Sequence, residues 1–219
     1  MSPPDAPRPP NLFGAAYSVY VRIVRLALEE KGVPYDLEEV DIFAPSGVPS
    51  AYLDRHPFGR IPAFEHQGFR LYETNAITRY VDAAFPGPPL QPRGIRERAR
   101  MDQIVSVLDN YAYRTLVWDI FVERVRLPQQ GRVSDEEKIR AALPRAKACF
   151  EALDRLREEH PFLAGPELSL ADLYAAPMLA YFAKAPEGAA LLLKFPHLSR
   201  WWEQIRQRPS MAATRSSLE

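Results

Sequence analysis

The stretch from Pro57 to Phe64 constrains the fold of this chain more than any other part of its sequence. The run Ile61-Pro62-Ala63-Phe64 has the apolar character of a strand, but proline cannot donate a hydrogen bond to a neighbouring strand. Within sheets, proline is confined to edges, strand starts and bulges. We therefore expect a short strand broken by proline, with Ile61-Pro62 as a candidate cis peptide bond. Such a bond would leave the backbone of Ile61 free to pair with an extended ligand.

A hairpin and a helix start follow this strand. His66-Gln67-Gly68 is typical of a turn, Leu71-Tyr72 of a second short strand, and Thr74 of the N-cap of a helix. Free N–H groups at a helix N-terminus attract carboxylates, and the adjacent Glu73 would attract an ammonium group. The segment is therefore suited to the zwitterionic head of an amino acid, although each motif alone also fits an ordinary hairpin and capped helix.

The preceding residues alternate strands and helices. Residues 11–16 have the pattern of a strand, residues 18–31 that of an amphipathic helix stopped by Gly32, and residues 35–41 that of a second strand. Together with the hairpin and its helix, this order is βαβ followed by ββα. The first unit should therefore contain a parallel strand pair with a helical crossover.

Strands disappear beyond the proline-rich residues 86–94, which cannot continue a helix and form a linker. The apolar spacing downstream predicts only helices. They comprise one long helix or two in register over 95–126, a helix opened by a capping box at 134–137, another opened by a capping box at 169–172, and a final helix around 198–205. The fold class is thus α/β followed by all-α.

Composition excludes several functional classes. The 28 Lys and Arg residues balance 28 Asp and Glu residues, so no net field favours nucleic acid or an acidic membrane surface. Cys149 is the only cysteine, which excludes an intrachain disulfide and suits the reducing cytoplasm. No segment approaches the roughly 18 apolar residues of a spanning helix, and His66, His160 and His197 lack metal-ligand spacing. We expect a cytoplasmic protein without a metal that binds a small molecule.

Two motifs resemble the glutathione-binding segment of the cytosolic glutathione transferases. They are the run from Phe58 to Phe64 and the run Tyr72-Glu73-Thr74-Asn75-Ala76-Ile77, and the resemblance extends over most of the chain. It implies a thioredoxin-like domain over residues 10–85, a linker over 86–94 and an all-helical domain over 95–210. It also implies glutathione as co-substrate, a small hydrophobic electrophile as acceptor, a homodimer, no metal and a role in detoxification.

The loop from Gly14 to Arg22 resembles that of the serine-using classes, such as phi, tau and theta, and of phi- and theta-like bacterial members. The resemblance makes Ser18 the catalytic serine, whose hydroxyl would stabilise the glutathione thiolate together with a helix N-terminus. A thiol has a reference pKa of about 8.5, and each unit of lowering corresponds to about 1.4 kcal/mol. Ser18 would otherwise merely cap the helix. Tyr17 is the alternative stabiliser, because other classes use a tyrosine here, or it lines the glutathione pocket.

The resemblance assigns the glutathione backbone to Ile61, Pro62, Glu73 and Thr74. Relatives carry a His, Gln or Lys for the glycyl carboxylate where this chain has Gly47-Val48. Arg60 could supply that cation instead, and His56 is another candidate, although a histidine before Pro-Phe-Gly is more often structural.

Tyr111, Tyr113 and Trp118 on the long helix would line the acceptor pocket, although a stripe at helical spacing is more often core, above all for Trp118 and Phe121. Two other functions stay open. One is glutathione-dependent peroxidase or dehalogenase chemistry on the same site, and the other is a non-catalytic binding or assembly protein of the same fold. Ser18 favours the enzyme.

Overall fold

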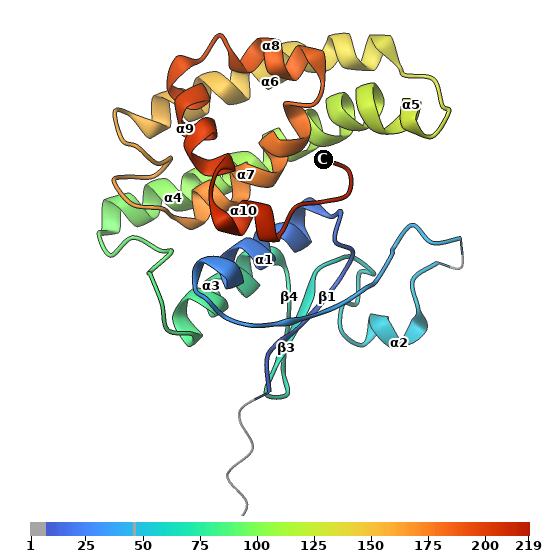
Figure 1. Cartoon of the computed structure of the whole chain (residues 1–219), viewed down its shortest axis with the longest axis vertical. Coiled ribbons are helices and arrows are strands. Elements are labelled where there is room, and N and C mark those ends of the chain that lie inside the picture. Colours follow the sequence, from blue (N-terminus) through green and yellow to red (C-terminus); the bar gives the residue numbers. More distant parts are fainter. Residues whose placement is uncertain (1–7, 46) are drawn as a thin grey trace, which may run out of the picture. The chain divides into compact units, whose positions relative to one another are not determined.

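The structure is a computed structural model that describes residues 8–45 and 47–219. The chain divides into two compact units, of which the first ends at Pro88 and the second spans Pro89–Glu219 (Figure 1). The division falls within the proline-rich segment.

The first unit is built on a four-stranded mixed sheet with the strand order β2-β1-β3-β4. Its strands are β1 (Asn11–Phe13), β2 (Asp36–Glu38), β3 (Ala63–His66) and β4 (Phe69–Tyr72). Strand β1 pairs parallel with β2 and antiparallel with β3, and β3 pairs antiparallel with β4. Gln67 and Gly68 join β3 to β4 with φ values of 52° and 82°, as a tight hairpin turn requires. The predicted thioredoxin-like order is confirmed.

Helices α1 (Val19–Glu30) and α3 (Thr74–Ala84) pack against each other beside the sheet (Figure 1). Their C-terminal ends are joined by the buried Lys31, whose ammonium donates to the Asp82 carboxylate at 3.0 Å and to the carbonyls of Asp82 and Pro88. The buried charge is therefore fully paired, which its desolvation demands. A third, one-turn helix, α2 (Ser50–Leu53), was not predicted from the sequence.

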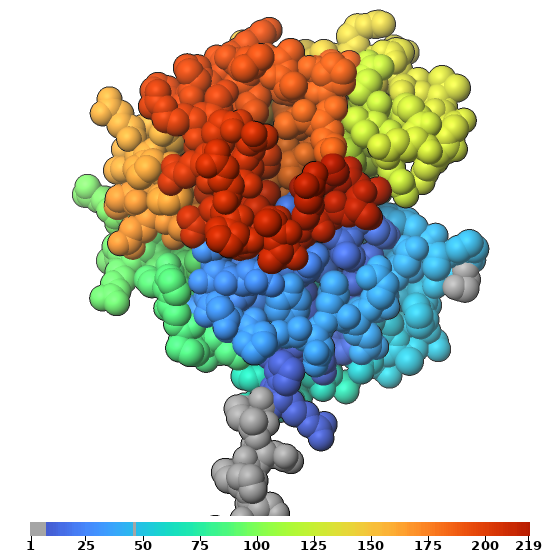
Figure 2. Space-filling model, in the orientation of Figure 1, coloured from blue at the N-terminus to red at the C-terminus, as the bar shows by residue number. Residues whose placement is uncertain are grey.

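Helices provide nearly all the regular structure of the second unit, as predicted. They are α4 (Ile95–Val107), η1 (Leu108–Arg126), α5 (Leu127–Gln129), α6 (Glu136–Arg157), α7 (Leu170–Phe182), α8 (Pro186–Leu192), α9 (Pro196–Arg206) and α10 (Pro209–Ala213). The central helix α7 is buried along its whole length and packs against α4, η1 and α9. In Figure 2, the C-terminal helices α8, α9 and α10, coloured orange to red, lie side by side on one face of this unit.

The segment η1 continues α4 without a break but is π-helical over its 19 residues. The sequence predicted one long helix or two in register from about Ile95 to Arg126, and the continuous stretch agrees with that prediction. It did not reveal the π character, because the apolar residues of this stretch recur three and four positions apart, which is the spacing of an α-helix. Long π-helices are rare, and most occur as single turns.

The start of α6 differs from the predicted capping box. The cap is Asp135, whose carboxylate accepts from the backbone N–H of Lys138 at 2.9 Å. Ser134 instead donates its hydroxyl to the backbone carbonyl of Glu123 at 2.8 Å. The helix end was located correctly, but its cap lies one residue later, because tertiary contact with η1 engages the serine.

The predicted capping box at the start of α7 is confirmed, and Asp172 extends it into the core. Its buried carboxylate accepts from the backbone N–H of Leu163 and Ser169, from the Ser169 hydroxyl and from the Trp201 indole, all within 2.9 Å. Burial raises the pKa of Asp172, and the four donors oppose that effect. This cluster joins α7 to α9 and to the loop before α7.

Among the described residues, no helix combines the length and apolar character needed to cross a membrane.

Candidate active site

Ser18 stands at the N-terminus of α1, directly after the loop that leaves β1, as the sequence predicted. Its side-chain oxygen accepts from the backbone N–H of Val21 at 3.4 Å, which is long for a hydrogen bond. The first turn of α1 contains no acidic residue. The positive end of this 12-residue helix is therefore weakly capped and can still interact with an anion.

Gly14 brings the Ser18 loop close to the proline loop. Its backbone N–H donates to the Glu38 carbonyl at 2.9 Å, and its φ is 149°. A Cβ atom at this position would lie 2.5 Å from Cγ2 of Val21 and 3.1 Å from Cβ of Ile61. Only glycine permits this approach without displacing those side chains. The Ile61-Pro62 bond beside it is cis, as predicted.

Glu73 occupies the N-cap position of α3 with φ 70° and ψ 116°, a conformation that non-glycine residues rarely adopt. Thr74 is the first residue of the helix, so its predicted role as N-cap is wrong by one position. The cause is that the Glu73 carbonyl already accepts the helical bond from Ile77 at 3.0 Å. The Glu73 side chain makes no capping hydrogen bond to this end of α3. Unfavourable backbone conformations of this kind cluster at functional sites.

Arg60 directly precedes the cis bond and has an exposed side chain. Its carbonyl accepts a 2.7 Å hydrogen bond from the phenol of Tyr52, a buried residue of α2. Burial raises the pKa of Tyr52, so this phenol stays protonated and holds the Arg60 backbone in place. The guanidinium itself reaches solvent, where it can meet an anion.

Tyr17 is already engaged in another interaction. Its phenol donates to a carboxylate oxygen of Asp41 at 2.7 Å, and the same oxygen accepts from the backbone N–H of Phe43 at 2.9 Å. A phenol has one proton to donate. Tyr17 therefore directs that proton away from any thiolate beside Ser18.

Comparison with known proteins places this geometry in a family. Residues 12–89 match the family model for the glutathione S-transferase N-terminal domain, and residues 106–209 match that for the C-terminal domain. A probable glutathione S-transferase of Oryza sativa subsp. japonica is 30% identical over 207 residues, which cover 93% of this chain and 94% of the relative. The chain belongs to the glutathione S-transferase family.

Solved structures of other transferases share its fold. Glutathione S-transferase I from maize in complex with an atrazine glutathione conjugate aligns with a TM-score of 0.82 at 29% identity, covering 94% of this chain and 96% of that one. The theta class enzyme of Xanthomonas axonopodis pv. citri with glutathione bound aligns with a TM-score of 0.81 at 28% identity, covering 98% of this chain and 100% of that one.

The predicted acceptor residues of the transferase all lie on η1. Tyr111 is 65% exposed, whereas Tyr113 and Trp118 are partly buried. Phe121 is core, because its ring is buried and stacks on Tyr181 at 4.4 Å with parallel planes. The packing alternative thus holds for Phe121, and the acceptor role of the other three stays a prediction.

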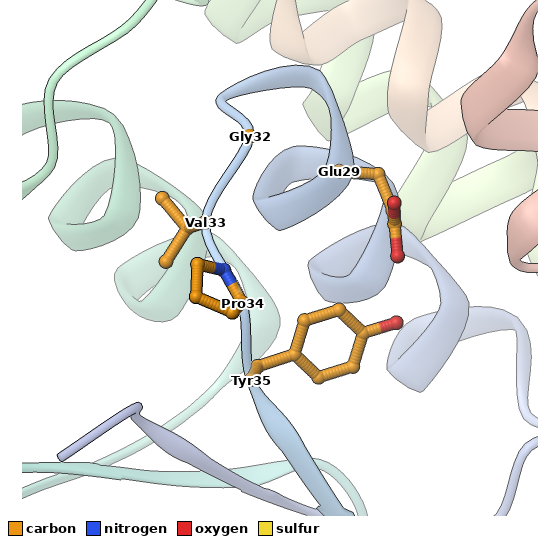
Figure 3. Close-up of a pocket in the computed structure, with 5 residues that line it drawn as sticks. All are labelled: Glu29, Gly32, Val33, Pro34 and Tyr35. Atoms are coloured by element: carbon orange, nitrogen blue, oxygen red, sulfur yellow. The ribbon is translucent and has the colours of Figure 1, made fainter.

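A pocket of about 520 Å³ lies at the opposite end of α1 from Ser18. It is lined by Glu29, Gly32, Val33, Pro34 and Tyr35, with Glu29 and Tyr35 on the same side (Figure 3). A 12-residue helix separates the two ends by roughly 18 Å. Its polar groups include the Glu29 carboxylate and the Tyr35 phenol, which accepts a hydrogen bond from Arg25 at 3.0 Å. None of the predicted site residues of the transferase lines it.

Among the residues that the structure describes, no group of three or more His, Cys, Asp or Glu side chains could hold a metal ion. Cys149 is buried, and burial raises the pKa of its thiol, which favours an unreactive core cysteine.

Proposed function

We propose that this transferase conjugates the glutathione thiolate to a hydrophobic electrophile and that Ser18 holds the thiolate. The proposal rests on the contrast between two neighbouring hydroxyl groups. Ser18 stands at a weakly capped helix N-terminus, whereas the Tyr17 phenol donates a hydrogen bond to Asp41. A hydroxyl donor and the positive end of a helix both favour an anionic sulfur. The serine-type, phi- or theta-like bacterial assignment is part of this proposal.

The second loop would hold the peptide part of glutathione. The Glu73 carboxylate suits the ammonium of the γ-glutamyl group, and the α3 N-terminus at Thr74 suits the neighbouring carboxylate. Arg60 would pair with the glycyl carboxylate, and Ile61 and Pro62 would contact the backbone of the peptide. Tyr17 would line the same pocket, and Tyr111, Tyr113 and Trp118 would line the acceptor pocket.

The chemical step then requires the protein only to stabilise the thiolate. The thiol proton leaves to solvent, the sulfur forms a bond to the electrophilic carbon, and the electron pair departs with a leaving group or enters an activated double bond. Stabilising the thiolate raises the fraction of reactive nucleophile at neutral pH. Ser18 performs this role by donating a hydrogen bond, and it takes up no proton.

We also propose that the transferase is a cytoplasmic homodimer that acts in detoxification. Exposed aromatic rings on the first unit support the dimer, since Phe58 and Tyr72 are 70% and 38% exposed with ring centroids 6.2 Å apart, and Phe43 is 61% exposed. Light scattering at micromolar concentration should give the mass of two chains, and Phe58→Ser should shift the equilibrium towards one chain. A wild-type monomer at that concentration would rule the dimer out.

Calorimetric titration with glutathione, followed by a panel of electrophiles, tests the function. We expect a dissociation constant between micromolar and millimolar, or about −4 to −8 kcal/mol, and turnover of activated halides or enones. Turnover of hydroperoxides or haloalkanes alone would indicate peroxidase or dehalogenase chemistry. The absence of glutathione binding would indicate a non-catalytic binding or assembly protein.

A further inference from the structure

His56 is a buried histidine that the chemistry above does not use. Its side chain is 2% exposed, and no other described residue hydrogen-bonds to its buried Nδ1 atom. Its ring packs 4.9 Å from that of Tyr72 and 6.2 Å from that of Phe58. A buried polar atom without a partner costs free energy, so its presence calls for an explanation.

The backbone around His56 is rigidly held. The N–H of His56 donates to the Tyr52 carbonyl at 3.0 Å, and the His56 carbonyl accepts from Gly59 at 2.9 Å. Tyr52 is in turn bonded to the Arg60 carbonyl. The imidazole therefore occupies a fixed place between the turn after α2 and the end of β4.

Burial lowers the pKa of His56, and this effect exceeds the opposing influence of the Glu73 carboxylate, while the Arg60 guanidinium adds to the lowering. Glu73 and Arg60 are the charged groups that act on this histidine, and the phenol of Tyr72 is the titratable group in ring contact with it. The imidazole is consequently neutral at pH 7. A neutral, buried ring is unsuited to pair with the glycyl carboxylate, which leaves Arg60 for that role.

We propose that His56 is a positioning residue that supports the Glu73 turn through Tyr72, and that it must stay neutral for the ammonium group of glutathione to bind. The inference rests on the proposed pairing of that ammonium with Glu73. Tyr72 directly precedes Glu73, so its ring contact with His56 helps to hold the backbone of Glu73, whose φ is 70°. A proton on His56 would place a second cation within reach of the carboxylate that the ligand needs, and it would oppose the ligand's ammonium.

The test is the affinity for S-methylglutathione, which has no thiol to ionise, between pH 5.0 and 7.5. In the wild type, the dissociation constant should rise by about threefold or more as the pH falls to 5.0. In His56→Asn, it should change by less than about twofold.

His66→Asn is the matched control, because His66 is the other histidine of the first unit and bonds Tyr80 through Nδ1 at 2.9 Å. It should keep the wild-type profile. A flat wild-type profile, or an acid limb retained in His56→Asn, would overturn the inference. If the wild type does not bind S-methylglutathione even at pH 7.5, the proposed function itself fails.

A second measurement does not depend on the folding of the variant. The His56 ring resonance of the wild type, followed by NMR against pH, should titrate at lower pH with S-methylglutathione bound than without it. Equal titration in both states would overturn the inference.

Discussion

Two helix N-termini of this transferase are built in opposite ways. At the start of α7, Ser169 and Asp172 satisfy each other, and the Asp172 carboxylate accepts four hydrogen bonds in the core. At the start of α3, Glu73 adopts a positive φ, and its side chain makes no capping hydrogen bond to the helix. One end is closed by its own residues, and the other is left open.

The difference distinguishes a helix end that contributes to stability from one that is available for binding a ligand. A helix end that is satisfied internally contributes to folding and has nothing left for a ligand. An end without a cap leaves free N–H groups, and its unfavourable backbone costs about 1–3 kcal/mol that the rest of the fold must offset. Helix α1 lies between these extremes, because Ser18 caps it through a long 3.4 Å bond.

The largest effect is expected at the closed end. Asp172→Ala leaves four buried donors without an acceptor, so the free energy of unfolding should fall by about 3–5 kcal/mol. Urea unfolding followed by circular dichroism measures this. Asp135→Ala is the matched control, since it removes an exposed cap that accepts from Lys138 and should cost about 1 kcal/mol. Equal losses in both variants would break the contrast between buried and exposed caps.

At the open end, Glu73→Gly should separate stability from affinity. Glycine adopts a φ of 70° readily, so the free energy of unfolding should stay the same or rise by up to about 1 kcal/mol. Affinity for glutathione should fall at least about tenfold, because the ligand's ammonium loses its charged partner. Gln67→Gly, at the φ of 52° in the turn between β3 and β4, should gain stability without losing affinity. Retained affinity in Glu73→Gly would exclude Glu73 from the site.

Ser18→Ala should have an intermediate effect. The pKa of bound glutathione should rise and turnover at neutral pH should fall by about tenfold or more, the cost of one hydrogen bond to a charged group. Stability should fall by no more than about 1 kcal/mol, because the cap bond is long. The ultraviolet absorbance of bound thiolate against pH reports the change. A thiolate that still forms at low pH in this variant would remove Ser18 from the proposed role.

The smallest effect is expected for Tyr17→Phe. The lost phenol is bonded to Asp41, so the pKa of bound glutathione should not move and its affinity should change by less than about twofold. Relative rates across an electrophile panel should shift instead. If this variant abolishes the low-pKa thiolate while Ser18→Ala keeps it, the roles of the two residues are reversed.

The sequence by itself determined where the strands and the long helices lie and where several of them start. Ser18 at α1, the capping box at Ser169 and the hairpin around Gly68 were predicted because their signals are local: a hydroxyl, a carboxylate three residues later, and a glycine in a turn. The cis Ile61-Pro62 bond was likewise predicted from a local signal, the proline within an apolar run. Each depends on neighbours within a few positions, which a sequence displays directly.

Only the tertiary structure decided which of these groups are satisfied. Tyr17 meets Asp41 across 24 positions, and Ser134 is drawn to Glu123 rather than to its own helix. The burial of His56 depends on the ring of Tyr72, which a strand and a hairpin bring to it. Local spacing does not predict such contacts, because burial and pairing arise from the packing of segments that are distant in the chain. The open start of α3 and the closed start of α7 could therefore be told apart only in the folded chain.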